Sequence, residues 1–250
     1  MPQLDFRAPR LFVDAPLRMG EVVLLEREQS NYLGNVLRLA EGDAIRVFNG
    51  RDGEWRAAIR GRKRPETLVI DAFERGQDRL PDLAYVFAPL KHARLDYMVQ
   101  KAVEMGASRL QPVITRFTQV SRVNGERMRA NAVEAAEQCG ILSLAAVTEP
   151  MPLERFMNER DGNRLLVFCD EAADVADPLE ALRGIAAAGQ GIDVLIGPEG
   201  GFAEEERALL RRQPRLLILS LGPRILRADT AAVAALALVQ AALGDWRNPS

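Results

Sequence analysis

Short apolar runs alternate with helix-like segments from residue 83 to residue 243, and this alternation limits the possible folds more than any other feature. The apolar runs have few polar interruptions, which is typical of strands buried on both faces of a parallel sheet. Strands that alternate with helices form such a sheet, with the helices packed on its two faces. The predicted strands are 83–88, 110–114, 164–169, 192–196 and 216–221, and the predicted helices are 95–106, 125–139, 177–188, 203–212 and 229–243. This part of the chain is therefore predicted to be α/β.

The first 75 residues have a different pattern. Residues 10–13, 21–25, 44–48, 54–59 and 67–70 are short β-branched or aromatic runs separated by turns, with one predicted helix at 29–39. Evenly spaced short strands predict a small β-barrel. A polar segment with glycine and proline follows at 75–81 and is predicted to be a linker. We therefore divide the chain into an N-terminal β-barrel domain, residues 1–75, and a C-terminal α/β domain, residues 76–250.

Composition indicates a soluble cytoplasmic protein. Hydrophobic residues make up 48% of the chain, enough for a sizeable core, and two cysteines are too few for a disulfide framework. The N-terminus has no apolar signal segment, and the longest apolar stretch, residues 231–243, is interrupted by Gln240. That stretch is shorter than a membrane span requires. We expect no membrane segment.

The net charge does not indicate nucleic-acid binding, but the basic residues are unevenly distributed along the chain. A formal net charge of −2 is unusual for a nucleic-acid-binding domain. Seven basic residues nevertheless lie between residues 46 and 64, against two acidic ones. Such a patch can neutralise phosphates, although a solvated loop explains the charges equally well.

Three predicted strand ends carry unusual residues, and ligands of open α/β sheets bind at the carboxyl ends of strands. These ends are residues 168–171, 195–202 and 219–230. The second contains three glycines and a proline, and Glu204, Glu205 and Glu206 follow it. These carboxylates would repel a phosphate, and the dinucleotide-binding glycine fingerprint is absent. The turn therefore favours a ligand bound through its nucleoside, although it could also be an ordinary tight turn.

The third strand end repeats the Gly-Pro pair and then supplies Arg224, Arg227 and Asp229 before an alanine-rich helix. Asp229 or Thr230 could cap that helix. Capping does not explain the arginines, which are candidates for contact with a ligand.

Other chemistries lack their residues. The chain has a single histidine, His92, so we predict no metal site. It has neither a Gly-x-Ser-x-Gly nucleophile elbow nor a phosphate-binding P-loop.

Two segments together resemble a known family. Gly-Pro-Glu-Gly-Gly-Phe at 197–202 and Leu-Gly-Pro-Arg-Ile-Leu-Arg-Ala-Asp-Thr-Ala at 221–231 resemble the RsmE family, the 16S rRNA (uracil-N3) methyltransferases of the knotted SPOUT superfamily. Weaker matches at 35–38, 48–50, 100–106 and 134–138 extend the resemblance over nearly the whole chain. The family usually has glutamate where Asp229 stands, a His-His pair where Ser30 and Asn31 stand, and arginine after Cys139.

The resemblance implies a fold and an activity. The fold would be a C-terminal trefoil-knotted α/β SPOUT domain with an N-terminal PUA-like β-barrel domain that binds RNA. The activity would be methylation of uridine N3 in 16S rRNA of the small ribosomal subunit, with S-adenosylmethionine (SAM) as cofactor. The protein would be a homodimer with its active site at the subunit interface.

The resemblance and the strand ends together give candidate site residues. Arg227 and Asp229 are the catalytic candidates: Arg227 for charge stabilisation or uracil orientation, Asp229 as a base or as the residue that orients the arginine. The candidates for SAM binding are Cys169, Glu171, Ile196, Gly197, Pro198, Glu199, Gly200, Gly201, Leu219, Leu221, Gly222, Ile225 and Leu226. The candidates for RNA binding are Arg10, Asn35, Arg38, Lys91, Lys101 and Arg116.

Two other functions remain open at this point. A knotted enzyme of another kind could methylate a ribose 2′-hydroxyl in tRNA or rRNA, but the asparagine motifs usual in those enzymes are not evident. An RNA-binding assembly factor without catalysis would have no need for two complete glycine-rich turns.

Overall fold

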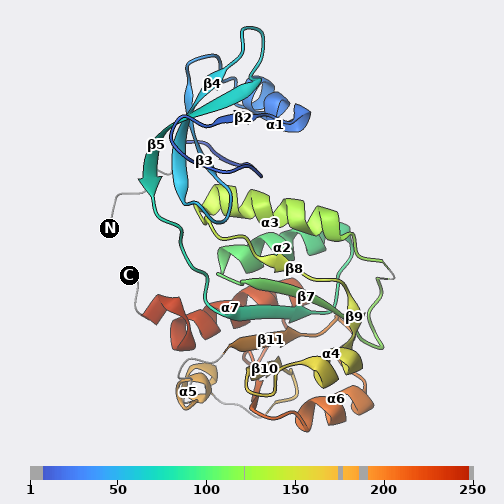
Figure 1. The fold of residues 1–250 in the computed structure, drawn as a ribbon. Helices are drawn as coiled ribbons and strands as arrows, with labels where there is room; N and C mark the ends of the chain where they lie inside the picture. Colours follow the sequence, from blue (N-terminus) through green and yellow to red (C-terminus); the bar gives the residue numbers. More distant parts are fainter. Residues whose placement is uncertain (1–7, 121, 174–176, 186–190, 248–250) are drawn as a thin grey trace. The chain divides into compact units, whose positions relative to one another are not determined.

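The chain divides into two units in the computed structural model, which describes residues 8–120, 122–173, 177–185 and 191–247 (Figure 1). The first unit contains residues 1–79 and 136–144, and the second contains residues 80–135 and 145–250. The boundary between them therefore falls within a helix, α3 (Gly125–Cys139).

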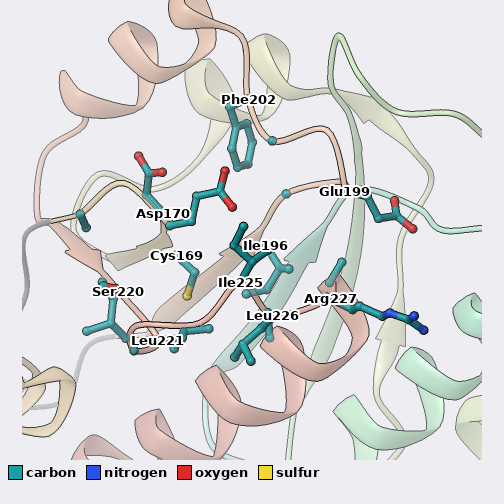
Figure 2. A pocket seen from close by; sticks show the side chains of 18 of the residues that line it. Cys169, Asp170, Ile196, Glu199, Phe202, Ser220, Leu221, Ile225, Leu226 and Arg227 are labelled. Carbon is teal, nitrogen blue, oxygen red and sulfur yellow. The ribbon is translucent and has the colours of Figure 1, made fainter.

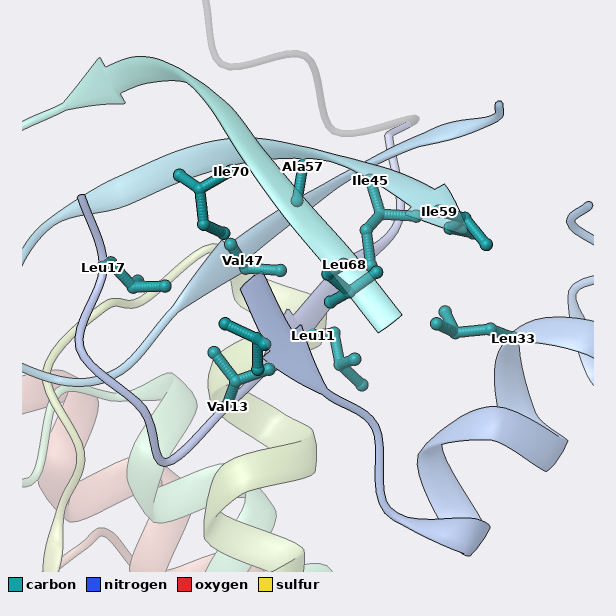
Figure 3. Close-up of a cluster of buried hydrophobic side chains, with 11 residues drawn as sticks. Leu11, Val13, Leu17, Leu33, Ile45, Val47, Ala57, Ile59, Leu68 and Ile70 are labelled. Atoms are coloured by element: carbon teal, nitrogen blue, oxygen red, sulfur yellow. The ribbon is translucent and has the colours of Figure 1, made fainter. Parts of the chain in front are cut away.

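The first unit is β-rich, as the sequence predicts. It contains β1 (Arg10–Phe12), β2 (Val22–Leu24), α1 (Arg27–Asn31), a π-helical turn η1 (Tyr32–Val36), β3 (Ala44–Phe48), β4 (Glu54–Arg60) and β5 (Thr67–Arg75). The strands form one sheet in the order β1-β3-β4-β5-β2, in which only the β1–β3 pair is parallel. Alternate residues on β3 to β5, such as Val47, Ile59 and Ile70, are buried and build a single apolar core (Figure 3). This alternation is what a sheet with one covered face requires.

The helix predicted at 29–39 is wrong in its second half. The α-helix ends at Asn31 and continues as the π-turn η1, in which the Leu37 amide donates to the Tyr32 carbonyl at 2.9 Å. Arg38 then takes a left-handed backbone with φ of 57°. A left-handed residue ends helical geometry.

Residues 136–144 belong to the first unit through specific hydrogen bonds. The amides of Leu142 and Ser143 each donate to the Asp78 carboxylate at 2.7 Å. The Phe12 amide donates to the Glu137 carboxylate at 2.8 Å. The predicted linker 75–81 is thus tied to a segment far along the chain.

The second unit confirms the predicted α/β class. It contains β6 (Leu83–Phe87), α2 (His92–Glu104), β7 (Arg109–Ile114), most of α3, β8 (Ala146–Val147), β9 (Met151–Pro152), α4 (Leu153–Glu159), β10 (Leu165–Cys169), α5 (Pro178–Arg183), β11 (Ile192–Ile196), α6 (Glu204–Arg211), β12 (Leu216–Leu219), α7 (Ala228–Leu243) and a 3₁₀ turn η2 (Asp245–Arg247). All strand pairs are parallel, in the order β12-β10-β11-β6-β7-β8, with β9 also paired to β7. The sequence did not predict β8, β9 or α4. The predicted helix 177–188 is observed as α5, and its part beyond residue 185 lies outside the described residues.

Opposite faces of the sheet pack on different helices (Figure 1). Val86, Phe168 and Leu195 face α4 and α6, where they form one apolar core with residues of those helices. The residues between them in sequence point to the other face, because side chains alternate along a strand. That face packs against α7, which contacts β11 and α2.

The amino ends of the central strands carry a buried network of charges. The fully buried Asp193 on β11 accepts from Arg164 at 2.8 Å and from Arg160 at 3.3 Å. Arg164 also donates to Asp82 at 2.6 Å.

No helix among the described residues is long and apolar enough to cross a membrane.

Candidate functional site

A pocket of about 740 Å³ opens at the carboxyl ends of β10, β11 and β12 (Figure 2). Three segments far apart in sequence form most of its lining: the end of β10 (169–173), the turn after β11 (196–202) and the loop from β12 into α7 (219–231). Arg207 on α6 completes it. This is the edge of a parallel sheet at which ligands bind, and the volume lies in the usual range for a small-molecule site.

The turn after β11 depends on its glycines. A Cβ on Gly197 would lie 2.5 Å from the Phe202 ring. Gly201 has a left-handed φ of 69°, and its amide donates to the Pro198 carbonyl at 2.9 Å. Phe202 in turn packs edge-on against Phe168, with ring centroids 5.1 Å apart. The glycines therefore let the backbone turn tightly around the Phe202 ring.

The centre of the pocket is apolar, and the loop from β12 to α7 contributes two of its side chains. Ile196, Ile225 and Leu226 lie together in its centre (Figure 2). Ile225 is 86% exposed, which is unusual for so large an apolar side chain. An exposed apolar side chain beside a cavity is typical of a ligand-binding surface.

Two groups at and below the pocket floor are neutral. Burial raises the pKa of the Cys169 thiol to about 12, so the sulfur keeps its proton at physiological pH. Beneath it, the Tyr85 hydroxyl is buried and has no hydrogen-bond partner among the described residues. Its pKa is raised well above the ordinary value by burial, and additionally by Cys169 and Asp229. Neither group offers a charge to a ligand.

A buried ion pair forms one wall. The Arg207 guanidinium on α6 donates from one nitrogen to both carboxylate oxygens of Asp170. The side chains are only 15% and 3% exposed, and both residues line the pocket. Neither residue was among the candidate site residues predicted from the sequence. Asp170 could have been predicted because it lies between Cys169 and Glu171, which were both candidates. Arg207 lies on α6, and no motif in the sequence marks it as a site residue.

All the residues predicted to bind a cofactor line this pocket except Gly200. A Cβ on Gly200 would lie 3.1 Å from the Cβ of Phe117, so this glycine permits close packing on the outer side of the turn. Arg224, predicted only as an arginine that could contact a ligand, also lines the pocket. Lining residues that were not among the candidate site residues are Asp170, Ala173, Phe202, Arg207, Ser220, Pro223, Ala228 and Ala231.

The two catalytic candidates differ in position. Arg227 lines the pocket at the end opposite Asp170 (Figure 2). Asp229 is half-buried in the first turn of α7 and is not among the lining residues. The capping prediction is wrong: the N-cap residue is Arg227, with no side-chain cap, and the Asp229 carboxylate accepts from the Thr230 amide at 2.8 Å.

The RNA-binding candidates fare unequally. Arg10 does not fit the prediction, because its side chain is 2% exposed and donates to Glu54 at 2.8 Å, so the guanidinium is not on the surface. Asn35, Arg38, Lys91 and Arg116 are exposed. Lys101 is about a third exposed and pairs with Glu104 at 2.6 Å. Among the described residues, no cluster of three or more His, Cys, Asp or Glu side chains could hold a metal ion.

Comparison with known proteins decides the family. An RNA methyltransferase domain model matches residues 78–240, and an RNA methyltransferase PUA domain model matches residues 25–70. A Synechocystis protein named ribosomal RNA small subunit methyltransferase E is 31% identical over 94% of this chain and 78% of its own length. This chain belongs to the RsmE family of RNA methyltransferases.

Two further proteins are similar to this chain along almost their whole length. The Rickettsia conorii protein of the same name is 28% identical, over 92% of this chain and 94% of its own length. A putative methyltransferase from Legionella pneumophila, solved in complex with bound SAM, has a TM-score of 0.83 at 28% identity. That likeness covers 94% of this chain and 98% of the Legionella chain. The predicted family and its PUA-like first domain are therefore confirmed.

Proposed function

We propose that this protein transfers the methyl group of SAM to N3 of a uridine in the 16S rRNA of the small ribosomal subunit. The observation that carries the proposal is the pocket formed by the two Gly-Pro turns that follow β11 and β12, the strands on either side of β10, in a chain of this family. In this proposal residues 76–250 carry the reaction, and residues 1–75 help to bind the RNA.

The residues of the pocket fit SAM. Ile196, Leu219 and Leu226 offer an apolar surface for the adenine, and the main chain of the turns offers amides and carbonyls for its polar edge. Glu171 and Glu199 can accept from the ribose hydroxyls. The turn carries no cradle for a phosphate, which suits a nucleoside that lacks one.

Residues of this chain would prepare the acceptor base. Bound SAM supplies a methyl group on a positively charged sulfur, which is electrophilic without a metal. Uracil N3 must lose its proton, and negative charge then develops on O2 and O4. Arg227, at the edge of the pocket, stabilises that charge, since a fixed cation is most effective where charge develops. Asp229, two residues further on, accepts the proton or orients Arg227.

The neutral Cys169 suits this chemistry. A thiolate in the pocket would compete with the uracil for the methyl group, because the thiolate is the nucleophilic form of cysteine. Burial keeps the pKa of this thiol at about 12 and therefore keeps the sulfur protonated.

RNA contacts would come from Asn35 and Arg38 in the first unit and from Lys91, Lys101 and Arg116 in the second. Phosphate contacts of this kind make binding fall steeply with salt. Uracil N3 lies on the Watson–Crick edge, so the target must be unpaired or flipped out of its helix. An assembled small subunit that fixes the RNA shape is therefore the proposed substrate.

The remaining parts of the proposal concern assembly and location. We propose a homodimer whose partner completes the active site, and a trefoil-knotted path through the second domain. The enzyme would act in the cytoplasm, where small ribosomal subunits are assembled.

The experiment uses small subunits from a strain that lacks the endogenous enzyme. The subunits are incubated with the protein and SAM, the RNA is digested to nucleosides, and mass spectrometry identifies methylated products. We expect 3-methyluridine. A 2′-O-methylated nucleoside instead would establish the ribose reaction, and no product despite measurable SAM binding would contradict the choice of RNA.

A further inference from the structure

The seven basic residues between positions 46 and 64 fall into two groups in the structure. Those before residue 60 each lie within 4.0 Å of a carboxylate: Arg46, Arg51 and Arg56. The other four are at the turn that joins β4 to β5 and are all exposed: Arg60, Arg62, Lys63 and Arg64. Of these four, only Arg64 has a carboxylate within 4.0 Å in the part of the chain that the structure describes, that of Glu66. Within this stretch, the cations without a carboxylate partner are thus concentrated in residues 60–66, the basic turn.

The backbone of the basic turn is tightly closed. The Glu66 amide donates to the Arg60 carbonyl at 2.9 Å. Gly61 has a φ of 139°, and a Cβ there would lie 2.1 Å from the Arg64 carbonyl oxygen. The turn therefore holds four like charges close together, and their mutual repulsion disfavours this arrangement in the absence of an anion. An anionic ligand would remove that repulsion.

The basic turn packs on the segment that carries two of the proposed RNA contacts. The Ser30 hydroxyl on α1 donates to the Pro65 carbonyl in the turn, and Figure 1 shows the turn beside α1. A Cβ on Gly34 in η1 would lie 2.9 Å from the Pro65 Cδ, so this glycine lets η1 approach the turn closely. Asn35 and Arg38 follow Gly34 in the sequence and are exposed. The basic turn and residues 35–38 therefore lie close together in the first unit.

The ligand that fits the basic turn is a chain of phosphates. Exposed arginine and lysine side chains bind phosphates, and several of them together match a polyanion better than one small ion. Residues 60–66 include no aromatic side chain on which a base could stack. Contacts to the phosphates position a nucleic acid without reading its sequence. The turn should therefore add affinity for RNA but no preference for particular bases.

We propose that the basic turn is a phosphate-binding site for the RNA substrate, which adds to the affinity supplied by residues 35–38 and takes no part in base recognition. Because this site takes RNA as its ligand, it rests on the proposed function. The turn contributes no residue to the pocket. We therefore expect loss of its charges to raise KM for the small subunit and to leave kcat unchanged.

The test is equilibrium binding of the full chain to small subunits, to protein-free 16S rRNA and to poly(U), over a range of salt concentrations. The turn variant carries three changes: Arg60→Gln, Arg62→Gln and Lys63→Gln. Each phosphate contact that is lost lowers the slope of log Kd against log salt by about 0.7–0.9. We therefore expect the slope to fall by about two to three, and Kd at about 0.1 M salt to rise on the order of 10²-fold, for all three ligands.

Two further variants serve as controls. The first removes three exposed arginines that lie outside the first unit and outside the pocket: Arg155→Gln, Arg211→Gln and Arg212→Gln. It changes the net charge by the same amount and should leave the slope unchanged. The second, Arg38→Gln, removes one of the proposed RNA contacts and should lower the slope by about 0.7–0.9. Thermal melting checks that each variant is folded, and we expect little change because all the altered side chains are exposed.

An unchanged slope in the turn variant, together with a lower slope in Arg38→Gln, would overturn the site and leave the proposed function standing. Equal effects of the turn variant and the three-arginine control would also overturn it, because they would reflect net charge alone. A loss of affinity for small subunits but not for protein-free rRNA would mean that the turn contacts a ribosomal protein. A loss for 16S rRNA but not for poly(U) would mean that it reads bases, and either result overturns the proposal. Absence of 3-methyluridine from subunits treated with the wild type would instead contradict the proposed function, and the binding results would still decide the role of the turn.

Discussion

Charged residues lie at both ends of the strands in the parallel sheet of the second unit. Those at the amino ends are buried in ion pairs, whereas some of those at the carboxyl ends face a cavity. At the amino ends, Asp193 is buried and accepts from Arg160 and Arg164, so its carboxylate is neutralised inside the protein and is not available to a ligand. At the carboxyl ends, Asp170 is also paired, with Arg207, but Arg227 and Glu171 face the cavity and have no ion-pair partner within 4.0 Å among the described residues.

Glycines follow the same division. A Cβ on Gly191, just before β11, would lie 1.9 Å from Arg164, so this glycine makes room for an ion pair. Gly197, just after β11, makes room for the Phe202 ring in the pocket turn. One strand therefore begins in a rigid charge network and ends in a ligand site. We expect changes at the amino end to reduce stability and changes at the carboxyl end to reduce binding or turnover.

The largest expected effect is at the amino end. Asp193→Ala removes the buried carboxylate with which Arg109, Arg160 and Arg164 all pair, and breaking a buried pair costs about 3–5 kcal/mol. Urea denaturation should show this loss in the free energy of unfolding. Glu159→Ala, which breaks the exposed Arg155–Glu159 pair, is the control and should change little. Normal stability of Asp193→Ala would remove the basis of the comparison.

Arg227→Ala tests the carboxyl end. The rate of methyl transfer at saturating SAM should fall roughly 10²–10³-fold, as for loss of a group that stabilises developing charge. Stability and the Kd for SAM should stay close to wild type, because the side chain is exposed. Formation of 3-methyluridine in subunits measures the rate. Unchanged turnover with normal SAM binding would exclude Arg227 from the mechanism.

Gly197→Ala places a Cβ against Phe202 and should distort the pocket turn. We expect the Kd for SAM to rise about tenfold or more, a loss of about 1.4 kcal/mol for each factor of ten. Calorimetry gives the Kd. Gly76→Ala is the matched control, since a Cβ there meets no atom within 4 Å. Equal effects in both variants would argue against a specific role for the turn.

Tyr85→Phe has the smallest expected effect and the opposite sign. Removing a buried hydroxyl without a partner should stabilise the protein by about 1 kcal/mol. Thermal or urea denaturation measures the change, with the exposed Tyr97→Phe as control. A loss of stability would show that the hydroxyl has a partner, such as a bound water.

Sequence reasoning found the elements with strong local signals. Helix α3 and strand β11 have the predicted bounds, because helical periodicity marks the first and an apolar run interrupted only by Asp193 marks the second. Helix α4 was missed because it is seven residues long and follows Pro150 and Pro152, which indicate a loop. The π-turn after α1 was missed because periodicity does not distinguish it from an α-helix.

The part of the site that lies at the ends of strands could be predicted from the sequence. Because parallel strands end at one edge, Cys169, Ile196 and Leu219 could be placed together from the sequence. Pairings between distant residues could not be. Arg10 reads as a surface cation, but it pairs with Glu54, 44 residues away. Arg207 reads as a solvated helix residue, but it pairs with Asp170, 37 residues away.

The first unit is discontinuous along the chain, because residues 136–144 belong to it. During synthesis, Asp78 leaves the ribosome more than 60 residues before the Leu142 and Ser143 amides that it binds. The first unit therefore cannot complete its hydrogen bonds until β6, β7 and all of α3 have been made. Chain order and folding order thus differ, and a fragment that ends at residue 79 would lack part of the unit to which it belongs.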